Sequence, residues 1–203
     1  IESLINVNSA VGGGFPNVEF KINKSGRIDY LYYCGLRVTK SGIFQGVEMN
    51  EDVMNDRLMT RIIDMGFFIG EKYAANGYRG YYDVDLVAAK NGDLYVSESN
   101  TRRTGGSHVY KTALKLIGKD FLDDTYVLSN NAWKLPNGAT PTFDKLLAVL
   151  KPVLFDKKSQ EGLVIASANL LRQGQLAYII FGQNKKHALE IEERSQKLLS
   201  QLS

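Results

Sequence analysis

The pattern of apolar and polar positions predicts strands at the start of the chain. Three apolar-rich runs are separated by turns that contain Ser-Gly. Short runs of this kind between glycine turns are typical of an antiparallel meander. The predicted strands are Val18–Asn23, Ile28–Val38 and Ile43–Met49.

Residues 50–76 are predicted to form a helix, because their apolar side chains recur at helical spacing. Gly77 follows and can cap the C-terminal end of that helix. The expected buried positions are Leu58, Met59, Ile62, Ile63, Phe67, Ile69 and Tyr73.

A hairpin is predicted next, with strands Tyr81–Ala89 and Asp93–Asn100 joined by a two-residue loop at Asn91-Gly92. Asn-Gly between alternating strands is a strong hairpin signal. A helix at 107–117 follows, with Ser107 expected as its N-cap.

The stretch 130–140 is rich in Asn, Pro and Gly, so we expect two domains, residues 1–130 and residues 131–203. The second domain should contain two helices and a hairpin. A sheet interleaved with helices in this order predicts an α+β fold rather than a doubly wound one. The expected elements are a helix at Pro141–Leu150 capped by Thr140, strands Gly162–Leu171 and Leu176–Phe181, and a helix at Lys185–Leu202 after Asn184.

Composition narrows the function classes. The 203 residues are 44% hydrophobic and carry a net charge of +3, so they lack the strong basic bias of a nucleic-acid binder. No apolar run reaches membrane-spanning length and no signal-peptide pattern opens the chain, which indicates a cytoplasmic protein without a membrane partner. The single cysteine, Cys34, excludes an intrachain disulfide and is expected to be a buried thiol.

Candidate chemistry gathers on the predicted hairpin. With Asn91-Gly92 as a two-residue loop, Asp85 lies opposite Glu98 and Asp83 lies opposite Asn100, all on one face. Facing carboxylates repel, and Mg²⁺, which prefers oxygen ligands, would relieve that repulsion. A solvated acidic patch remains the alternative, and a slip of one residue would separate Asp85 from Glu98.

The residues after the hairpin suit phosphate. Arg102 and Arg103 come directly after the carboxylates, and Gly105 and Gly106 open a helix whose free N–H groups favour anions. Arg102 shares strand parity with Glu98, so it is the better candidate for facing the site. The loop at 12–14 has three glycines but lacks the Gly-Lys-Ser/Thr ending of a P-loop.

Gly77–His108 resembles the last catalytic segment of the ATP-grasp superfamily. The matching features are a Gly-x-Arg-Gly turn, an acid ending the first strand, and a Glu-x-Asn-x-Arg sequence ending the second. The resemblance implies that Asp85, Glu98 and Asn100 bind Mg²⁺. It also implies that Arg102 is catalytic and that Arg102, Gly105 and Gly106 contact the phosphates of ATP. The D-alanine-ligase branch has an arginine where this chain has Asp83, so that role does not transfer.

The resemblance implies an ATP-grasp C-terminal lobe with a small C-terminal α/β appendage. Such a chain would be part of a ligase that joins a carboxylate to an amine through an acyl phosphate. The expected partners are these small-molecule substrates and an N-terminal ATP-grasp lobe of the same polypeptide, which nothing in this sequence matches. Pro141–Ser203 resembles the appended domain of pheganomycin-type peptide ligases, and Glu2 could lie in the hinge that contacts adenine.

Two other functions stay open. The lobe could bind nucleotide or a partner without turnover, or the same carboxylates could serve a hydrolase or phosphatase. Hydrolysis of ATP that depends on a carboxylate and an amine would separate a ligase from a non-catalytic module. A shift of melting temperature with Mg-ATP, but not with Mg²⁺ alone, would argue against a hydrolase or phosphatase.

Overall fold

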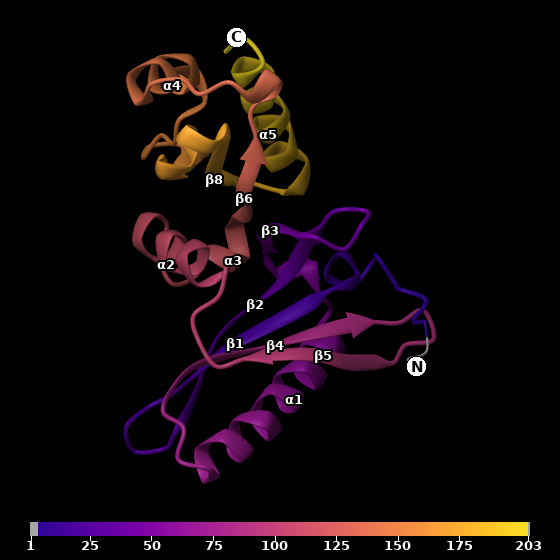
Figure 1. The fold of residues 1–203 in the computed structure, drawn as a ribbon. Coiled ribbons are helices and arrows are strands. Elements are labelled where there is room, and N and C mark those ends of the chain that lie inside the picture. The colour runs from indigo at the N-terminus through magenta and orange to yellow at the C-terminus, as the bar shows by residue number, and fades with distance from the viewer. Residues whose placement is uncertain (1–3, 203) are drawn as a thin grey trace. The chain divides into compact units, whose positions relative to one another are not determined.

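The computed structural model describes residues 4–202 and divides the chain into two compact units (Figure 1). The first unit comprises the residues up to Arg37 together with Glu51–Tyr110, and the second comprises Val38–Asn50 and the residues from Lys111 onward. The predicted domain boundary after residue 130 falls inside strand β6, Tyr126–Lys134. Both units combine antiparallel strands with helices, which confirms the α+β prediction.

The first unit holds a four-stranded antiparallel sheet in the order β5-β4-β1-β2. Helix α1 runs along one face of this sheet (Figure 1). Asn55 caps α1 by accepting a hydrogen bond from the Leu58 amide, so the helix begins six residues later than predicted. The elements are β1 Pro16–Ile22, β2 Ile28–Val38, β4 Gly80–Ala88, β5 Leu94–Asn100, α1 Asp56–Ala75 and the short 3-10 turns Gly12–Gly14 and Glu51–Val53.

Two glycines bring α1 close to the sheet. A Cβ atom on Gly66 would lie 2.1 Å from the Phe20 ring, and one on Gly70 would lie 2.0 Å from the Tyr82 hydroxyl. The Phe20 and Tyr82 rings stack with centroids 5.2 Å apart beneath the helix. Of the predicted apolar positions, Ile62 is fully buried, so the contact combines a few large side chains with glycine gaps that receive aromatic rings.

The β4–β5 hairpin corrects the predicted turn. Its loop has three residues, because Ala89 and Asp93 are joined by a backbone hydrogen bond of 2.9 Å. Val96 therefore opposes Leu86 rather than Val87. An extra residue near Ser97 then shifts the register back, and Asp85 opposes Glu98 as the sequence predicts.

The second unit holds strands in the order β3-β6-β8-β7. Leu176–Phe181 of β8 is buried at every position, and helix α5 packs on this strand. Neither β6 nor α3 was predicted from the sequence. The elements are β3 Phe44–Met49, β6 Tyr126–Lys134, β7 Gly162–Ser167, β8 Gln175–Gly182, α3 Phe121–Asp124, α4 Phe143–Leu150, α5 Lys185–Leu199 and the 3-10 turns Pro136–Gly138, Lys151–Val153 and Asn169–Gln173.

Two predicted ends in the second unit change, and a third is confirmed. Thr142 caps α4 in place of Thr140, since its hydroxyl accepts from the Lys145 amide at 3.3 Å. A 3-10 turn at Asn169–Gln173 connects β7 to β8, so the first strand of that hairpin is shorter than predicted. Asn184 caps α5 as expected, accepting from the His187 amide at 2.9 Å. Across residues 4–202, no helix has the length and apolarity needed to cross a bilayer.

A candidate metal and phosphate site on the first unit

The face of the sheet opposite α1 carries polar residues on β1 and β4. Asn17 opposes Asp85, and Glu19 opposes Asp83. Directly opposed residues share a face, and so do alternate residues of one strand. Phe20 and Tyr82, the neighbours of these residues, point to α1 instead. The predicted carboxylates therefore stand on the face that the helix leaves uncovered.

Asn17 joins the two aspartates. Its side-chain nitrogen donates to Asp83 at 2.9 Å and to Asp85 at 2.6 Å, and its oxygen accepts a long 3.5 Å contact from the Cys34 thiol. Asn17 and Asp83 are each 2% exposed, and Cys34 is fully buried as predicted. The sequence analysis missed Asn17, although its alternation with Val18 placed it on the same face as Glu19.

Burial, with repulsion from a neighbouring carboxylate, raises the pKa of both aspartates. Loss of hydration is the main cause that raises the pKa of Asp83 to about 6, and the negative charge of Asp85 is the second cause. Loss of hydration is also the main cause of the raised pKa of Asp85, and the negative charge of Glu98 raises it further. The hydrogen bond from Asn17 and the positive charge of Arg102 act in the opposite direction and lower this pKa. A cation beside these groups would favour their charged forms.

The β5 residues complete the predicted ligand set. Glu98 is exposed and opposes Asp85. The backbone amide of Asn100 donates a hydrogen bond to Asp83 Oδ1 at 3.1 Å. The side-chain nitrogen of Asn100 lies 3.5 Å from Asp85 Oδ2. The structure thus brings Asp85, Glu98 and Asn100 together. The buried Asp83 lies beside them, with its two oxygens accepting from Asn17 and Asn100.

Arg102 reaches the site by a different route from the one predicted. Strand β5 ends at Asn100, so strand parity does not place the Arg102 side chain. Its Nη2 instead donates to the Asn100 side-chain oxygen at 3.0 Å, and its Nη1 donates to the Arg103 carbonyl at 3.2 Å. Arg103 stacks on Tyr81, with its guanidinium carbon 4.5 Å from the ring centroid.

Glu19 anchors the segment that carries Gly105 and Gly106. This carboxylate is 1% exposed and accepts hydrogen bonds from the hydroxyls of Tyr32 and Thr104, both at 2.9 Å. The Ser107 hydroxyl also donates to it, at 2.7 Å. Ser107 is the first residue of α2, Ser107–Leu116, so its side chain ties the helix to β1 and is not the predicted N-cap.

The close approach at Gly106 has a steric reason. A Cβ atom there would lie 2.6 Å from the Tyr32 hydroxyl. The Tyr32 ring in turn stacks on Tyr110 of α2 with centroids 4.7 Å apart. Sequence reasoning missed Glu19, whose signal was an acid within the apolar run of β1.

The donor set suits Mg²⁺, which takes carboxylate and amide oxygens and completes its shell with phosphate and water. Two carboxylates and an amide meet that requirement, and the raised pKa values of Asp83 and Asp85 show charge that a cation would stabilise. Among residues 4–202, no group of three or more His, Cys, Asp or Glu side chains is arranged to hold a metal ion by itself. Glu2, the expected adenine contact, lies outside the described residues.

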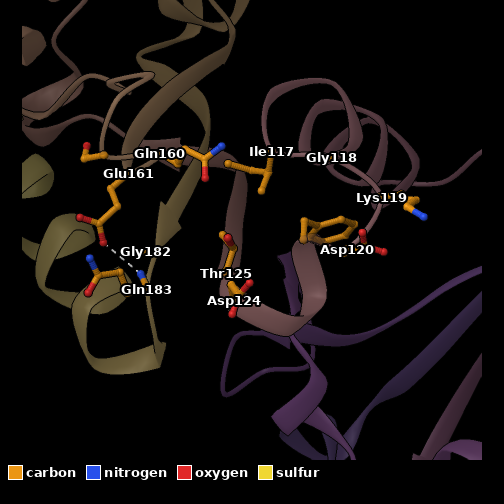
Figure 2. Close-up of a pocket in the computed structure, with 12 residues that line it drawn as sticks. Ile117, Gly118, Lys119, Asp120, Asp124, Thr125, Gln160, Glu161, Gly182 and Gln183 are labelled. Atoms are coloured by element: carbon orange, nitrogen blue, oxygen red, sulfur yellow. Dashed lines mark hydrogen bonds between the residues drawn. The ribbon is translucent and has the colours of Figure 1, made fainter.

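A hollow of about 320 Å³ lies in the second unit (Figure 2). Glu161 there accepts a hydrogen bond from the Gln183 amide at 3.0 Å, drawn as a dashed line, and pairs with His187 at 2.6 Å. Asp120 and Asp124 also line it, but none of the predicted site residues does. The site residues predicted from the sequence therefore all lie in the first unit.

Comparison with solved structures confirms the fold. The chain superposes on biotin carboxylase from Campylobacter jejuni, crystallised with an ATP analogue, with a TM-score of 0.64 and 10% identity over 92% of this chain and 48% of that one. For the ATPase subunit of phosphoribosylaminoimidazole carboxylase from Aquifex aeolicus, the TM-score is 0.60 and the identity is 13%, over 98% of this chain and 58% of that one. The biotin carboxylase domain of 2-oxoglutarate carboxylase from Hydrogenobacter thermophilus was solved with MgADP and bicarbonate. Its TM-score is 0.57 and its identity is 11%, over 89% of this chain and 44% of that one.

The chain therefore shares the fold of the parts of these proteins that it covers, which is an α+β lobe of the ATP-grasp kind with a small appended α/β part. The chain spans about half the length of the structures that it matches. No protein-family model matches the chain, and no curated protein sequence matches it significantly. At 10–13% identity the likeness defines the fold and leaves the reaction to be argued from the site.

Proposed function

We propose that this chain is the Mg²⁺- and nucleotide-binding lobe of an ATP-dependent ligase that joins a carboxylate to an amine. The lobe would act with a second, N-terminal ATP-grasp lobe of the same polypeptide, in the cytoplasm. Peptide-bond formation, as in the pheganomycin-type ligases, is the form of this reaction that we propose.

One observation carries the proposal: the register of β4 and β5 sets Asp85 against Glu98, with Asn100 beside them and Arg102 hydrogen-bonded to Asn100. Phosphoryl transfer depends mainly on positioning and on neutralising charge. A face with oxygen donors followed by an exposed guanidinium could supply both.

Each residue then has a role. Asp85, Glu98 and Asn100 would hold Mg²⁺, which on binding neutralises phosphate charge and acts as a Lewis acid. Arg102 would release Asn100 and hydrogen-bond the phosphoryl group as it moves from ATP to the substrate carboxylate. Gly105 and Gly106 would let the backbone approach the phosphates at the start of α2.

The resulting acyl phosphate is the species that the amine attacks. The amine nitrogen bonds to the acyl carbon, the carbon–oxygen bond to phosphate breaks, and a proton leaves the nitrogen. Asn17 and Glu19 do not touch the reacting atoms; they hold the aspartates and the 104–107 segment in place.

The metal part of the proposal can be tested on this chain. We expect Mg²⁺ to shift the backbone amide signals of Asp85, Glu98 and Asn100 in two-dimensional NMR spectra. Asp85→Asn should abolish these shifts, whereas Asp64→Asn, the same change at an exposed position of α1, should leave them intact. Unchanged hairpin signals in the presence of Mg²⁺ would rule out the metal site.

The reaction itself needs both lobes. A protein containing this chain and the second lobe should form ADP only when a carboxylate and an amine are both present. The chain alone should form no amide, because ATP-grasp enzymes hold ATP between two lobes. ATP hydrolysis without either substrate would favour a hydrolase, and nucleotide binding without hydrolysis would favour a non-catalytic module.

A further inference from the structure

A basic cluster lies on the same sheet face as the carboxylates. Lys21 opposes Tyr81 across β1 and β4, two positions from the pair formed by Glu19 and Asp83. The Lys21 ammonium is 5.5 Å from the centroid of the Tyr81 ring, and the Arg103 guanidinium carbon is 4.5 Å from it. Arg103 Nη2 also donates to the Tyr81 hydroxyl at 3.4 Å. One aromatic ring thus holds two cations.

The cluster continues into a hollow of about 740 Å³ with three basic residues and no acid in its lining. Lys21 belongs to both the hollow and the cluster. The other two cations are Lys24, at the β1–β2 turn, and Arg79, whose Nη1 donates to the carbonyls of Ala74 and Tyr78. Carbonyl partners fix the Arg79 side chain without neutralising its charge.

In the described part of the chain, no carboxylate lies within ion-pair distance of these cations. Asp29 opposes Lys21 across β1 and β2, but it pairs with Arg27 at 2.9 Å. No ion pair between residues 4 and 202 involves Lys21, Arg79 or Arg103. Partly exposed Lys21 and exposed Arg103 remain accessible from solvent. Like charges gathered around one ring repel each other, so an anion bound between them would be stabilised.

We propose that Lys21, Tyr81 and Arg103 form the subsite for a second anionic group of the carboxylate substrate. This inference rests on the proposed ligase function and adds to it a substrate class, a molecule with a reactive carboxylate and a distant carboxylate or phosphate. The hollow beside Lys21 gives the remainder of such a molecule space.

The spacing along β4 sets the size of the substrate. A strand rises about 3.4 Å per residue, so Tyr81 lies roughly 7 Å from Asp83 and about 14 Å from Asp85. A carboxylate reacting beside Arg102 and the metal ligands would lie several bonds from the group held by Lys21 and Arg103. An acidic dipeptide or a phosphorylated acid of similar length spans such a distance.

The experiment uses the 203-residue chain and NMR titrations at low ionic strength, with Mg²⁺ absent. The probes are N-acetyl-Glu-Glu for the carboxylate source, inorganic phosphate for the phosphate source, and N-acetyl-Gln-Gln amide as the uncharged control. We expect an anionic probe to shift the amides of Lys21, Tyr81 and Arg103, and the uncharged probe to leave them unchanged. Whichever anion binds more tightly identifies the source.

Charge-matched variants test whether these side chains are responsible. Lys21→Gln/Arg103→Gln should weaken binding of the anionic probe roughly tenfold or more, since hydrogen bonds to charged groups are lost. Lys157→Gln/Lys158→Gln removes the same charge from an exposed turn of the second unit and should keep the wild-type affinity. Equal weakening by both pairs would reduce the effect to net charge and overturn the subsite.

A separate Mg²⁺ titration distinguishes this proposal from the ligase proposal. Shifts at Asp85 and Glu98 with Mg²⁺, but none near Tyr81 with either anion, would reject the subsite and leave the metal site standing. Anion shifts at Tyr81 without any Mg²⁺ response would support the anion subsite and reject the metal site. Anion shifts confined to other residues would reject the subsite directly.

Discussion

The acids of the β4–β5 hairpin in the first unit and the partnered acids of the second unit have opposite surroundings. In the second unit, Glu192 accepts a hydrogen bond from Tyr178 at 2.8 Å, and Glu48 pairs with Lys185 at 3.2 Å and with the Tyr126 hydroxyl. In the first unit, Asp83 and Asp85 are alternate residues on one face of β4, and Asp85 opposes Glu98 on β5.

This difference separates a structural use of charge from a functional one. A buried acid with a hydroxyl or cation partner is satisfied within the fold. Acids that lie close to other acids carry negative charge that the fold does not compensate, and a bound cation can compensate it. The first unit therefore gives up stability at the face that we propose binds ligands, while the second keeps a covered sheet with apolar β8 at its centre.

The largest expected effect comes from the cation beside those acids. In a protein with both lobes, Arg102→Ala should lower kcat about 100-fold, near 3 kcal/mol, as expected for losing one donor to a developing charge. The KM for ATP should change little. Arg102→Lys should restore only part of the rate, because an ammonium lacks the planar fork of a guanidinium.

Steady-state kinetics on Arg103→Ala provide the comparison for Arg102. Because Arg103 stacks on Tyr81 instead of contacting Asn100, its loss should raise the KM of the carboxylate substrate and largely spare kcat. A kcat lost in Arg103→Ala but kept in Arg102→Ala would reverse the assignment.

The covered face of the first unit should be the next most sensitive. Gly66→Ala places a methyl group 2.1 Å from the Phe20 ring, so we expect a loss of about 1–3 kcal/mol in the free energy of unfolding. Urea denaturation measures it. Gly118→Ala has nothing within 4 Å of its new Cβ but a φ of 130°, so it reports backbone strain without overpacking. Equal losses would remove the packing explanation.

The buried acids Glu19 and Glu192 test the comparison itself. Each Glu→Gln change should cost about 1–2 kcal/mol, since hydroxyl donors lose an ionised acceptor. Only Glu19→Gln should also weaken the NMR response of residues 104–107 to Mg-ATP, because Glu19 holds Thr104 and Ser107. The response should survive Glu192→Gln. If both variants respond as wild type does, Glu19 has only a structural role.

Local sequence signals predicted much of the candidate site. Asp85 and Glu98 face each other as expected, but two errors cancelled: the loop is one residue longer than predicted, and an extra residue near Ser97 restores the register. Residue types alone do not show a bulge, since it depends on how the strands twist together. Arg102 likewise reaches Asn100 through a bend and not through a continuing strand.

Strand β6 shows why other parts were missed. The sequence predicts a domain boundary at residue 130, in an Asn-, Pro- and Gly-rich stretch, yet Ser129 and Asn130 at the centre of the strand are buried. The Ser129 hydroxyl accepts a hydrogen bond from the Val47 backbone amide at 3.0 Å. Position 46 must be glycine for the strands to approach this closely, because a Cβ atom on Gly46 would lie 2.1 Å from the Ser129 carbonyl oxygen. Partners far away in sequence satisfy these groups, so no local pattern could predict the strand.

The smallest expected effect tests the register near Ser97. Tyr95 and Val96 are neighbours in β5 and are similarly exposed, at 42% and 43%. Tyr95 opposes Val87, which shares the face of Asp85, whereas Val96 opposes Leu86, which shares the face of Tyr82 beneath α1. A carboxylate introduced at residue 95 therefore lies nearer the proposed metal ligands than one introduced at residue 96.

At a separation of about 10 Å, an added charge should change Mg²⁺ affinity only about twofold in salt solution, because water and ions screen it. We expect Tyr95→Asp to tighten Mg²⁺ binding by that factor and Val96→Asp to have a smaller effect, measured by calorimetry on the 203-residue chain. An unbroken two-residue-loop register would reverse the order, because Val96 would then oppose Val87. Tighter Mg²⁺ binding by Val96→Asp alone would therefore support the register predicted from the sequence and contradict the bulge near Ser97.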